Sequence, residues 1–142
     1  MTKERARQVA APPWRKRRGR LEIMLVTSRE TRRWVIPKGG VMAHLIDMNA
    51  ARQEAFEEAG IVGRMKRKML GTYTYAKPSG QQSIMQHAVK VFALQVRREL
   101  RNWPEKRQRK RQWFGVEEAA EKVIEPGLRR IIRAWRLKQT IP

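Results

Sequence analysis

Three glutamates on one turn of a predicted helix constrain this chain more than any other feature. The chain is otherwise strongly basic, with 33 Lys and Arg against 13 Asp and Glu and a formal net charge of +20. A helix is predicted to begin near Asp47, a favourable N-cap, and to end at Gly60, the usual residue after a helix C-terminus. Within it Glu54, Glu57 and Glu58 share one face, where like charges repel. Such a cluster favours cation binding over a solvated acidic face.

The other side of this predicted helix is apolar and is expected to pack on a core. Residues with small or apolar side chains recur there at helical spacing: Met48, Ala51, Ala55 and Ala59. Ala50 lies one turn before Glu54 on the acidic side, where a small side chain would leave room for a ligand.

A glycine turn precedes the helix. A short apolar strand over residues 34–36 is predicted to run into the turn Pro37-Lys38-Gly39-Gly40. A Gly-rich turn before a helix lets backbone groups approach a ligand closely. Mg²⁺ is bound by carboxylate oxygens together with substrate phosphates. The turn and the acidic face therefore predict a metal site, with Lys38 as either an exposed turn lysine or a phosphate contact.

Length and composition favour one globular domain over residues 1–142, with residues 1–8 flexible. Hydrophobic residues make up 41% of the chain, and the absence of cysteine excludes disulfides, thiolate metal sites and a cysteine nucleophile. No apolar run approaches the length of a membrane span, and the polar N-terminus is no secretory signal, so we expect a cytoplasmic protein. The positive charge would attract polyanions, either nucleic acid, phosphorylated small molecules or acidic membrane surfaces. The oligomeric state stays open.

The remaining segments predict an α/β fold, an α/β/α sandwich with a mixed β-sheet. Strands are expected over residues 9–11, 21–27, 34–36, 69–76 and 86–96, and further helices over 116–123 and 126–137. The runs 69–76 and 86–96 are predicted to pair as an antiparallel hairpin. The basic block 97–111 is too rich in Arg and Lys to be buried, and Trp103 is expected to anchor it.

Residues 34–61 resemble the signature of the Nudix hydrolases, G-x5-E-x7-R-E-U-x-E-E-x-G-U, in which U is aliphatic. With Gly39 as the first glycine, the residues in register are Glu54, Glu57, Glu58, Gly60 and Ile61. Leu45 and Gln53 depart from the pattern, because they stand where a glutamate and an arginine belong. In the family that pair usually braces the loop against the helix. Losing both leaves no buried charge without a partner, so an altered brace under an intact acidic face is expected.

Two further segments are similar to the diphosphoinositol polyphosphate phosphohydrolase branch of this family: RRWVIPKGGVM and WPEKRQRKRQWFGVEEA. The resemblance implies a Nudix-type pyrophosphohydrolase that cleaves a phosphoanhydride bond in a polyphosphorylated small molecule. Dinucleoside polyphosphates, diphosphoinositol polyphosphates and nucleoside polyphosphates are the substrate classes it suggests. A highly phosphorylated substrate also agrees with the positive charge of the chain.

The resemblance implies a role for each matched residue. Glu54, Glu57 and Glu58 would be catalytic and would hold Mg²⁺ or Mn²⁺ together with the Gly39 carbonyl, while Lys38 and Gly40 would bind substrate phosphates. The general base would be one of these glutamates or an acid outside the signature, for which the candidates are Glu99, Glu105 and Glu117. Each of these three is otherwise a surface residue.

Two other functions stay open at this point. One is an enzyme that acts on the 5′-triphosphate end of RNA and binds the RNA through the basic segments 15–20 and 97–111. The other is a non-catalytic basic module that binds polyanions, suggested by Leu45 and Gln53. The three repelling carboxylates speak against the second function, because an idle site has no need of them.

Overall fold

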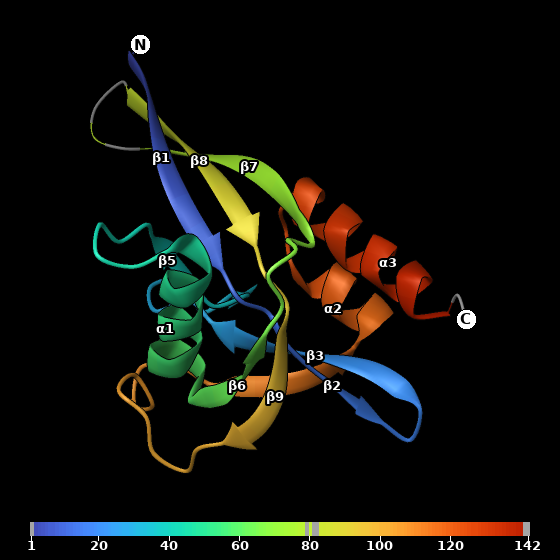
Figure 1. The fold of residues 1–142 in the computed structure, drawn as a ribbon. Helices are drawn as coiled ribbons and strands as arrows, with labels where there is room; N and C mark the ends of the chain where they lie inside the picture. Colours follow the sequence, from blue (N-terminus) through green and yellow to red (C-terminus); the bar gives the residue numbers. More distant parts are fainter. Residues whose placement is uncertain (1, 79, 81–82, 141–142) are drawn as a thin grey trace.

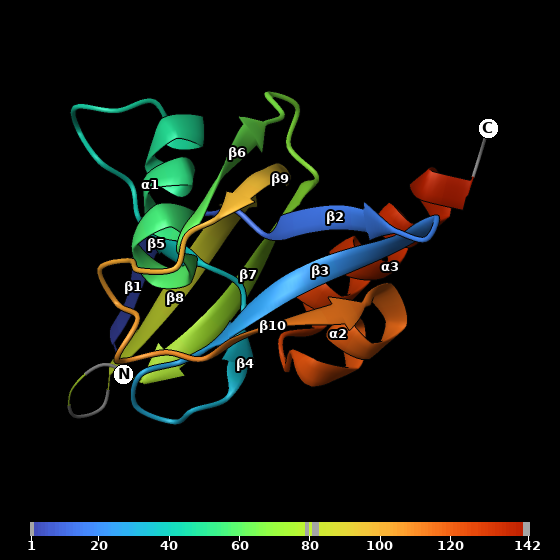
Figure 2. The same ribbon diagram turned by 90° about the horizontal axis from the view of Figure 1, so that it is seen from below.

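The computed structural model describes residues 2–78, 80 and 83–140, which form two β-sheets and three helices. The strands are β1 (Thr2–Ala10), β2 (Pro13–Arg17), β3 (Arg20–Thr27), β4 (Trp34–Val35), β5 (Lys38–Gly40), β6 (Ile61–Met65), β7 (Gly71–Pro78), β8 (Ser83–Val91), β9 (Leu94–Glu99) and β10 (Arg111–Gly115). The helices are α1 (Asp47–Ala59), α2 (Val116–Lys122) and α3 (Pro126–Thr140). Figures 1 and 2 show α1 on one side of the sheets and α2 and α3 on the other. No helix in this described part of the chain is long and apolar enough to cross a membrane.

Both sheets are mixed, and they are joined through their parallel pairs. One sheet has the strand order β5-β1-β8-β7, and the other has β10-β3-β2-β9-β6 with β4 beside β3. β1 is parallel to β8, and β2 is parallel to β9. The segments that join β1 to β2 and β8 to β9 run side by side from one sheet to the other. They are hydrogen-bonded to each other, because Phe92 N donates to Ala10 O over 2.9 Å and Leu94 N donates to Pro12 O over 3.3 Å. The predicted mixed sheet is confirmed in this two-part form.

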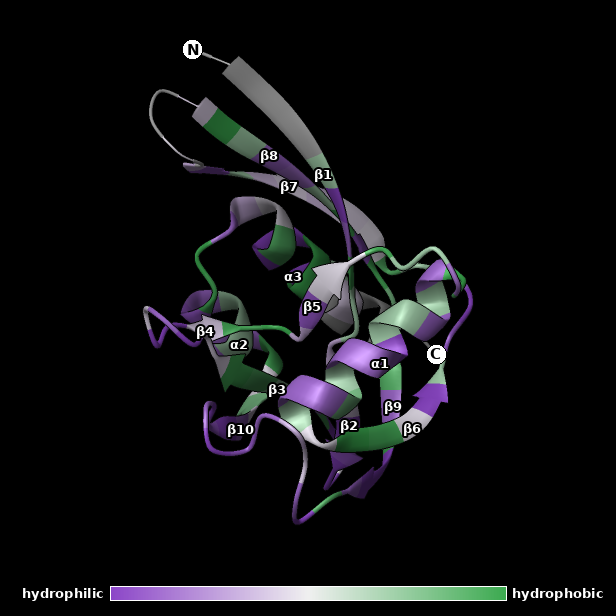
Figure 3. Ribbon diagram, turned by 90° about the vertical axis from the view of Figure 1, so that its left-hand side faces the viewer, coloured by the Kyte–Doolittle hydropathy of each residue, from purple (hydrophilic) through white to green (hydrophobic). Residues whose placement is uncertain are grey.

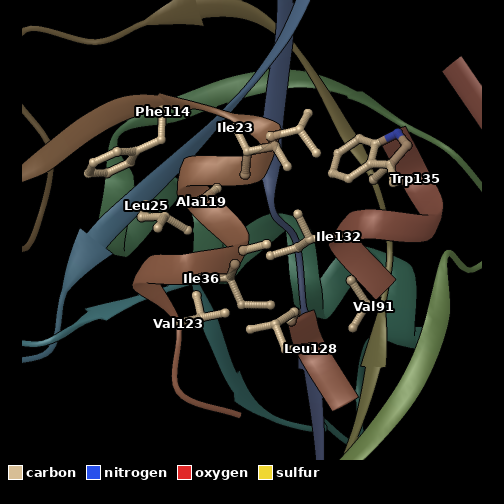
Figure 4. Packing of buried hydrophobic residues seen from close by; sticks show 14 of the residues in the cluster. Ile23, Leu25, Ile36, Val91, Phe114, Ala119, Val123, Leu128, Ile132 and Trp135 are labelled. Atoms are coloured by element: carbon tan, nitrogen blue, oxygen red, sulfur yellow. The ribbon is translucent and has the colours of Figure 1, made fainter. Parts of the chain in front are cut away.

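Strand β3 is buried on both faces, which explains its nearly continuous apolar sequence. Ile23 and Leu25 belong to the apolar cluster covered by α2 and α3 (Figure 4), whereas Met24 and Val26 belong to the cluster covered by α1. Successive strand residues point to opposite faces, so one strand supplies both cores. This arrangement confirms the predicted α/β/α sandwich.

Helix α1 has the predicted length, but Asp47 is not its N-cap. Gly60 follows the helix with a φ of 66°, as expected of a glycine after a helix C-terminus. The N-cap is Ile46, without a side-chain cap hydrogen bond, and not Asp47 as predicted. Asp47 is instead the first helical residue, and its carboxylate pairs with Lys90 Nζ over 2.9 Å. Figure 3 shows hydrophilic and hydrophobic residues alternating along α1.

Three local predictions need correction. Thr2–Gln8 belong to β1, paired with β8, where a flexible end was expected. The glycine turn is the short strand β5, which pairs antiparallel with β1. The predicted strand over 86–96 breaks at Phe92 and Ala93, where the chain changes sheets. Strand β6 was not foreseen, because exposed and basic residues interrupt its apolar pattern. The predicted hairpin is confirmed as β7 and β8.

Candidate functional site

Helix α1 brings two of the three glutamates into direct contact. Glu58 is only 5% exposed and Glu54 is half-buried, and their carboxyl groups are hydrogen-bonded to each other. Burial raises the pKa of Glu58 to about 8; Arg109 opposes this rise, and Glu54 adds to it. Burial also raises the pKa of Glu54, partly offset by the hydrogen bond with Glu58. Because its pKa lies above 7, the Glu58 carboxyl group keeps its proton near neutral pH in the absence of a cation.

Gly39 in β5 lets the backbone lie directly against this pair. A Cβ atom at Gly39 would come within 2.3 Å of the Glu54 carboxyl carbon. The amide of Lys38 donates to Glu58 Oε1 over 3.4 Å. A Cβ at Gly40, by contrast, would meet nothing within 4 Å. The glycine that the signature requires is therefore Gly39, and it is required by the Glu54 carboxyl group.

Glu57 and Ala50 are placed differently from their predicted arrangement. The Glu57 carboxylate accepts a hydrogen bond from Gln53 Nε2 over 3.1 Å. Within the described residues, no three Asp, Glu, His or Cys side chains are gathered closely enough to form a metal site as they stand. Ala50 is fully buried in the apolar cluster under α1, so its small side chain serves packing and leaves no room for a ligand.

The basic segment after β9 reaches into this site, contrary to the prediction that it stays at the surface. The Arg109 side chain is 9% exposed and its Nη2 lies 3.8 Å from Glu58 Oε1. Its Nε donates to Glu105 Oε1 over 2.8 Å, and its Nη1 donates to Thr27 O over 3.1 Å. A buried guanidinium is tolerated because oxygen acceptors surround its donors.

Of the three acids outside the signature, Glu105 is the one at the site. Glu99 lies 3.5 Å from Arg15 and Glu117 lies 2.8 Å from Arg133, both on other surfaces. The spacing of Glu105 and Arg109 by four residues is a helix-like pairing that the sequence displays. It could have marked these two residues as partners.

A pocket of about 620 Å³ opens beside Glu58. Its cationic lining comprises Arg29, Arg33, Lys38, Lys77 and Arg109. Burial lowers the pKa of Lys38, and the carboxylates of Glu125 and Glu58 oppose that change. Lys38 is therefore no exposed turn lysine, but a half-buried cation in the pocket wall.

The wall of the pocket opposite α1 holds a partly buried ion pair that the sequence did not reveal. Arg33 Nη2 lies 3.1 Å from Glu125 Oε2, although the two residues are 92 positions apart. Glu125 is only 5% exposed. Arg33 Nη1 and Glu125 Oε1 are buried, and neither has a hydrogen-bond partner among the described residues. These free polar atoms give the pocket hydrogen-bonding capacity that a polar ligand could use.

Aromatic rings form a third part of the pocket wall. Tyr75 and His87 stack with their ring centroids 4.7 Å apart and an interplanar angle of 10°. The Tyr75 hydroxyl donates to Gln8 Oε1 over 2.8 Å, and Lys38 Nζ lies 5.6 Å from the Tyr75 ring centroid. His87 packs in this stack and also lines the pocket.

The chain belongs to the Nudix family, because the model of the NUDIX domain matches residues 4–135. Nudix hydrolase 12, mitochondrial, of Arabidopsis thaliana is 37% identical over 105 residues, which are 72% of this chain and 52% of that protein. Diphosphoinositol polyphosphate phosphohydrolase 3-beta of Bos taurus is 37% identical over 101 residues, 69% of this chain and 57% of that protein. The chain thus spans about half the length of these curated relatives.

Solved structures share the fold at lower sequence identity. A NUDIX hydrolase from Nitrosomonas europaea superposes with a TM-score of 0.75 at 17% identity, covering 98% of this chain and 93% of that one. An Ap4A hydrolase of C. elegans, in a binary complex, gives a TM-score of 0.69 at 18% identity, covering 94% and 96%. The Nudix fold extends over nearly the whole chain.

Proposed function

We propose that this chain is a metal-dependent hydrolase that cleaves a phosphoanhydride bond in a polyphosphorylated small molecule. One observation carries the proposal: Glu54 lies against the Gly39 backbone, and the adjacent buried Glu58 lines a pocket with cationic walls. Carboxylates attract a divalent cation, and the cationic wall attracts phosphates. The named activities of the similar proteins, on diphosphoinositol polyphosphates and on Ap4A, fit the same substrate class.

The residues present fit a divalent cation. A protonated carboxyl group becomes a ligand when a cation replaces its proton, and the Glu54 carboxyl group lies directly against the Gly39 backbone. We assign Glu54, Glu58 and the Gly39 carbonyl as ligands. Glu57 would be the third carboxylate ligand, after giving up its hydrogen bond from Gln53 to bind the cation. A bound Mg²⁺ or Mn²⁺ would neutralise phosphate oxygens and activate water for attack.

The pocket would receive the phosphates that do not react. Lys38 offers a point charge and Gly40 a backbone contact, whereas Arg33 and Arg109 offer planar donors suited to phosphate oxygens. Arg109 also touches Glu58, so it would place a phosphate next to the carboxylate pair. Dinucleoside, diphosphoinositol and nucleoside polyphosphates all carry phosphates in a row, which this arrangement of cations suits.

Phosphate release from a panel of substrates tests the proposal. The panel comprises dinucleoside polyphosphates, nucleoside triphosphates, diphosphoinositol polyphosphates and 5′-triphosphorylated RNA, each with Mg²⁺ and with Mn²⁺. Hydrolysis of a small substrate that RNA competitor leaves unchanged is expected. Preference for RNA, with a steep salt dependence, would instead favour the RNA 5′-end alternative. If no member of the panel is hydrolysed, the result would instead favour a non-catalytic module that binds polyanions. A cytoplasmic location stays a prediction, since Nudix hydrolase 12 is named as mitochondrial.

Glu105 is the acid that we assign as general base. Its carboxylate is held by Arg109, which also contacts Glu58, and it therefore lies closer to the site than Glu99 or Glu117. Replacing Glu105 with Gln should lower kcat by about 10²–10⁴-fold, the usual contribution of a positioned base. Steady-state phosphate release measures this. Glu99→Gln, on another surface, should keep the wild-type kcat, and a Glu105→Gln variant as active as wild type would contradict the assignment.

The raised pKa of Glu58 makes the stability of the metal-free protein depend on pH. The folded protein keeps a proton that the unfolded chain loses between about pH 4.5 and pH 8, so the free energy of unfolding should fall as pH rises through this window. The slope is at most about 1.4 kcal/mol per pH unit. Thermal unfolding in EDTA at pH 6 and pH 8 measures it, and Glu58→Gln should remove the difference. Mg²⁺ should raise Tm more at pH 8 than at pH 6; an equal shift at both would count against the site.

A further inference from the structure

The C-terminal end of α1 is held by side chains from residues 100–111, the segment that follows β9 and ends at the first residue of β10. The last carbonyls of a helix have no partner within the helix. Trp103 Nε1 donates to Glu58 O over 3.0 Å, and Arg111 Nη1 donates to Ala59 O over 2.8 Å. Two side chains of one segment thus bind the backbone of the buried glutamate and of its neighbour.

Backbone groups of the same segment complete this attachment. The amide of Glu105 donates to Glu57 O over 3.0 Å, and the amide of Leu100 donates to Gly60 O over 2.8 Å. Carbonyls of four successive residues, 57 to 60, therefore accept hydrogen bonds from residues 100–111. The segment is attached along the whole end of the helix and not at a single point.

Trp103 and Arg111 also pack on each other, which makes the attachment rigid. The Arg111 guanidinium carbon lies 3.9 Å from the Trp103 ring centroid, and its Nη2 donates to Leu100 O over 2.7 Å. A Cβ at Gly60 would come within 2.7 Å of the Trp103 ring and 2.8 Å of Arg111. We call Trp103 and Arg111, closed over Gly60, the helix clamp.

The same segment also holds the side chain of Glu58. Arg109, between Trp103 and Arg111 in sequence, lies 3.8 Å from Glu58 Oε1 and pairs with Glu105. Glu58 is thus contacted at its carbonyl by the helix clamp and at its carboxylate by Arg109. Moving the segment relative to α1 would change the separation between Glu58 and both Arg109 and Glu105.

We propose that Trp103 and Arg111 are positioning residues for hydrolysis. By binding the carbonyls of Glu58 and Ala59, they fix the distance from the α1 carboxylates to Arg109 and Glu105. The inference rests on the proposed function, because it assigns the clamp to the geometry of that reaction. It predicts that loosening the clamp lowers the rate of the chemical step more than it weakens substrate binding.

Trp103→Phe tests the inference, because it keeps an aromatic ring but removes the N–H donor together with part of the indole; the loss of ring volume is matched by the control below. The expected result is a kcat lower by about 10–100-fold, the cost typical of losing a partner that orients a metal ligand, with KM within about threefold of wild type. Arg111→Lys, which keeps one donor group, should retain more activity than Arg111→Met. Tm is measured on each variant so that all rates refer to folded protein.

Trp113→Phe is the matched control. Trp113 also donates its Nε1 to a glutamate residue, Glu99, over 3.3 Å, and it also carries an arginine, Arg15, 4.1 Å from its ring centroid. It does not touch the end of α1 through these contacts, so this variant should keep the wild-type kcat. An unchanged kcat in Trp103→Phe, or an equal loss in both tryptophan variants, would overturn the inference.

Amide hydrogen exchange separates this inference from the proposed function. Trp103→Phe should speed exchange at residues 56–60 and 105–109, whereas Trp113→Phe should not. If the wild type releases phosphate and only the Trp103 variant loses kcat and protection, both proposals stand. If the wild type hydrolyses nothing, the proposed function fails by itself. Unchanged exchange in Trp103→Phe would overturn the clamp in either case.

Discussion

Glu58→Gln is expected to abolish hydrolysis, lowering kcat by more than about 100-fold. Losing a residue that only orients a metal ligand costs about 10–100-fold, and Glu58 is assigned as a ligand itself. Glutamine has nearly the same shape but no charge, so the α1 helix should keep its packing. Steady-state phosphate release with Mg²⁺ or Mn²⁺ measures the effect.

The control for this variant is Glu121→Gln on α2, an exposed carboxylate. It should leave kcat unchanged. In EDTA at pH 8, Glu58→Gln should be at least as stable as the wild type, because it removes a buried carboxylate whose ionised form is unfavourable. A Glu58→Gln variant that retains most of its kcat would contradict the assignment of Glu58 as a ligand.

Gly39→Ala is expected to have a similarly large effect for a steric reason. The added methyl group would stand 2.3 Å from the Glu54 carboxyl carbon, well inside van der Waals contact. Either the carboxyl group or strand β5 must move, and each change separates Glu54 from the Gly39 carbonyl. We expect kcat to fall by more than about 100-fold and the affinity for Mn²⁺ to fall with it.

Gly115→Ala is the matched control, because a Cβ at Gly115 meets nothing within 4 Å and its φ of −62° suits any residue. It should keep the wild-type kcat and affinity for Mn²⁺. Calorimetry measures the affinity for Mn²⁺, and phosphate release measures kcat, for both variants. Wild-type activity in Gly39→Ala would show that the contact between β5 and Glu54 has no part in the site.

The parts of the site that were predictable from the sequence are those that depend on local spacing. The helix end at Gly60 follows from the usual place of glycine after a helix C-terminus, and the shared face of Glu54 and Glu58 follows from the helical repeat. The packing of Ala51 and Ala55 follows in the same way, and the structure confirms both. Ala50 was misplaced because helical spacing defines a face only to within part of a turn, and close packing of α1 on the sheet buried this residue as well.

The pocket could not be derived from the sequence, because it is built by contacts between distant residues. Arg33 and Glu125 meet across 92 positions, and nothing local links them. Tyr75 and His87 come together through the register of β7 and β8, which pairs these two residues directly. A hairpin was predicted there, but its register depends on the turn and the packing of both strands.

The burial of Arg109 and the partial burial of Arg111 show why composition alone did not predict the position of the basic block 97–111. A run of Lys and Arg is usually solvated, yet each of these guanidinium groups finds carbonyl or carboxylate oxygens. Arg111 binds Ala59 O and Leu100 O, and Arg109 binds Thr27 O and Glu105. Apart from Glu105, which lies four positions before Arg109, acceptors such as Ala59 O at a helix end and Thr27 O at a strand end become visible only once the fold is known.

Titration of Mn²⁺ into the metal-free protein tests the central claim, that the Glu54 and Glu58 pair is a cation site. Calorimetry at pH 7 in buffers of different ionisation enthalpy reports the protons released on binding. Because Glu58 keeps its proton below about pH 8, about one proton should leave for each Mn²⁺ bound, and Glu58→Gln should lose both the binding and the proton release. Binding of unchanged affinity in Glu58→Gln, or no binding to the wild type, would contradict the claim.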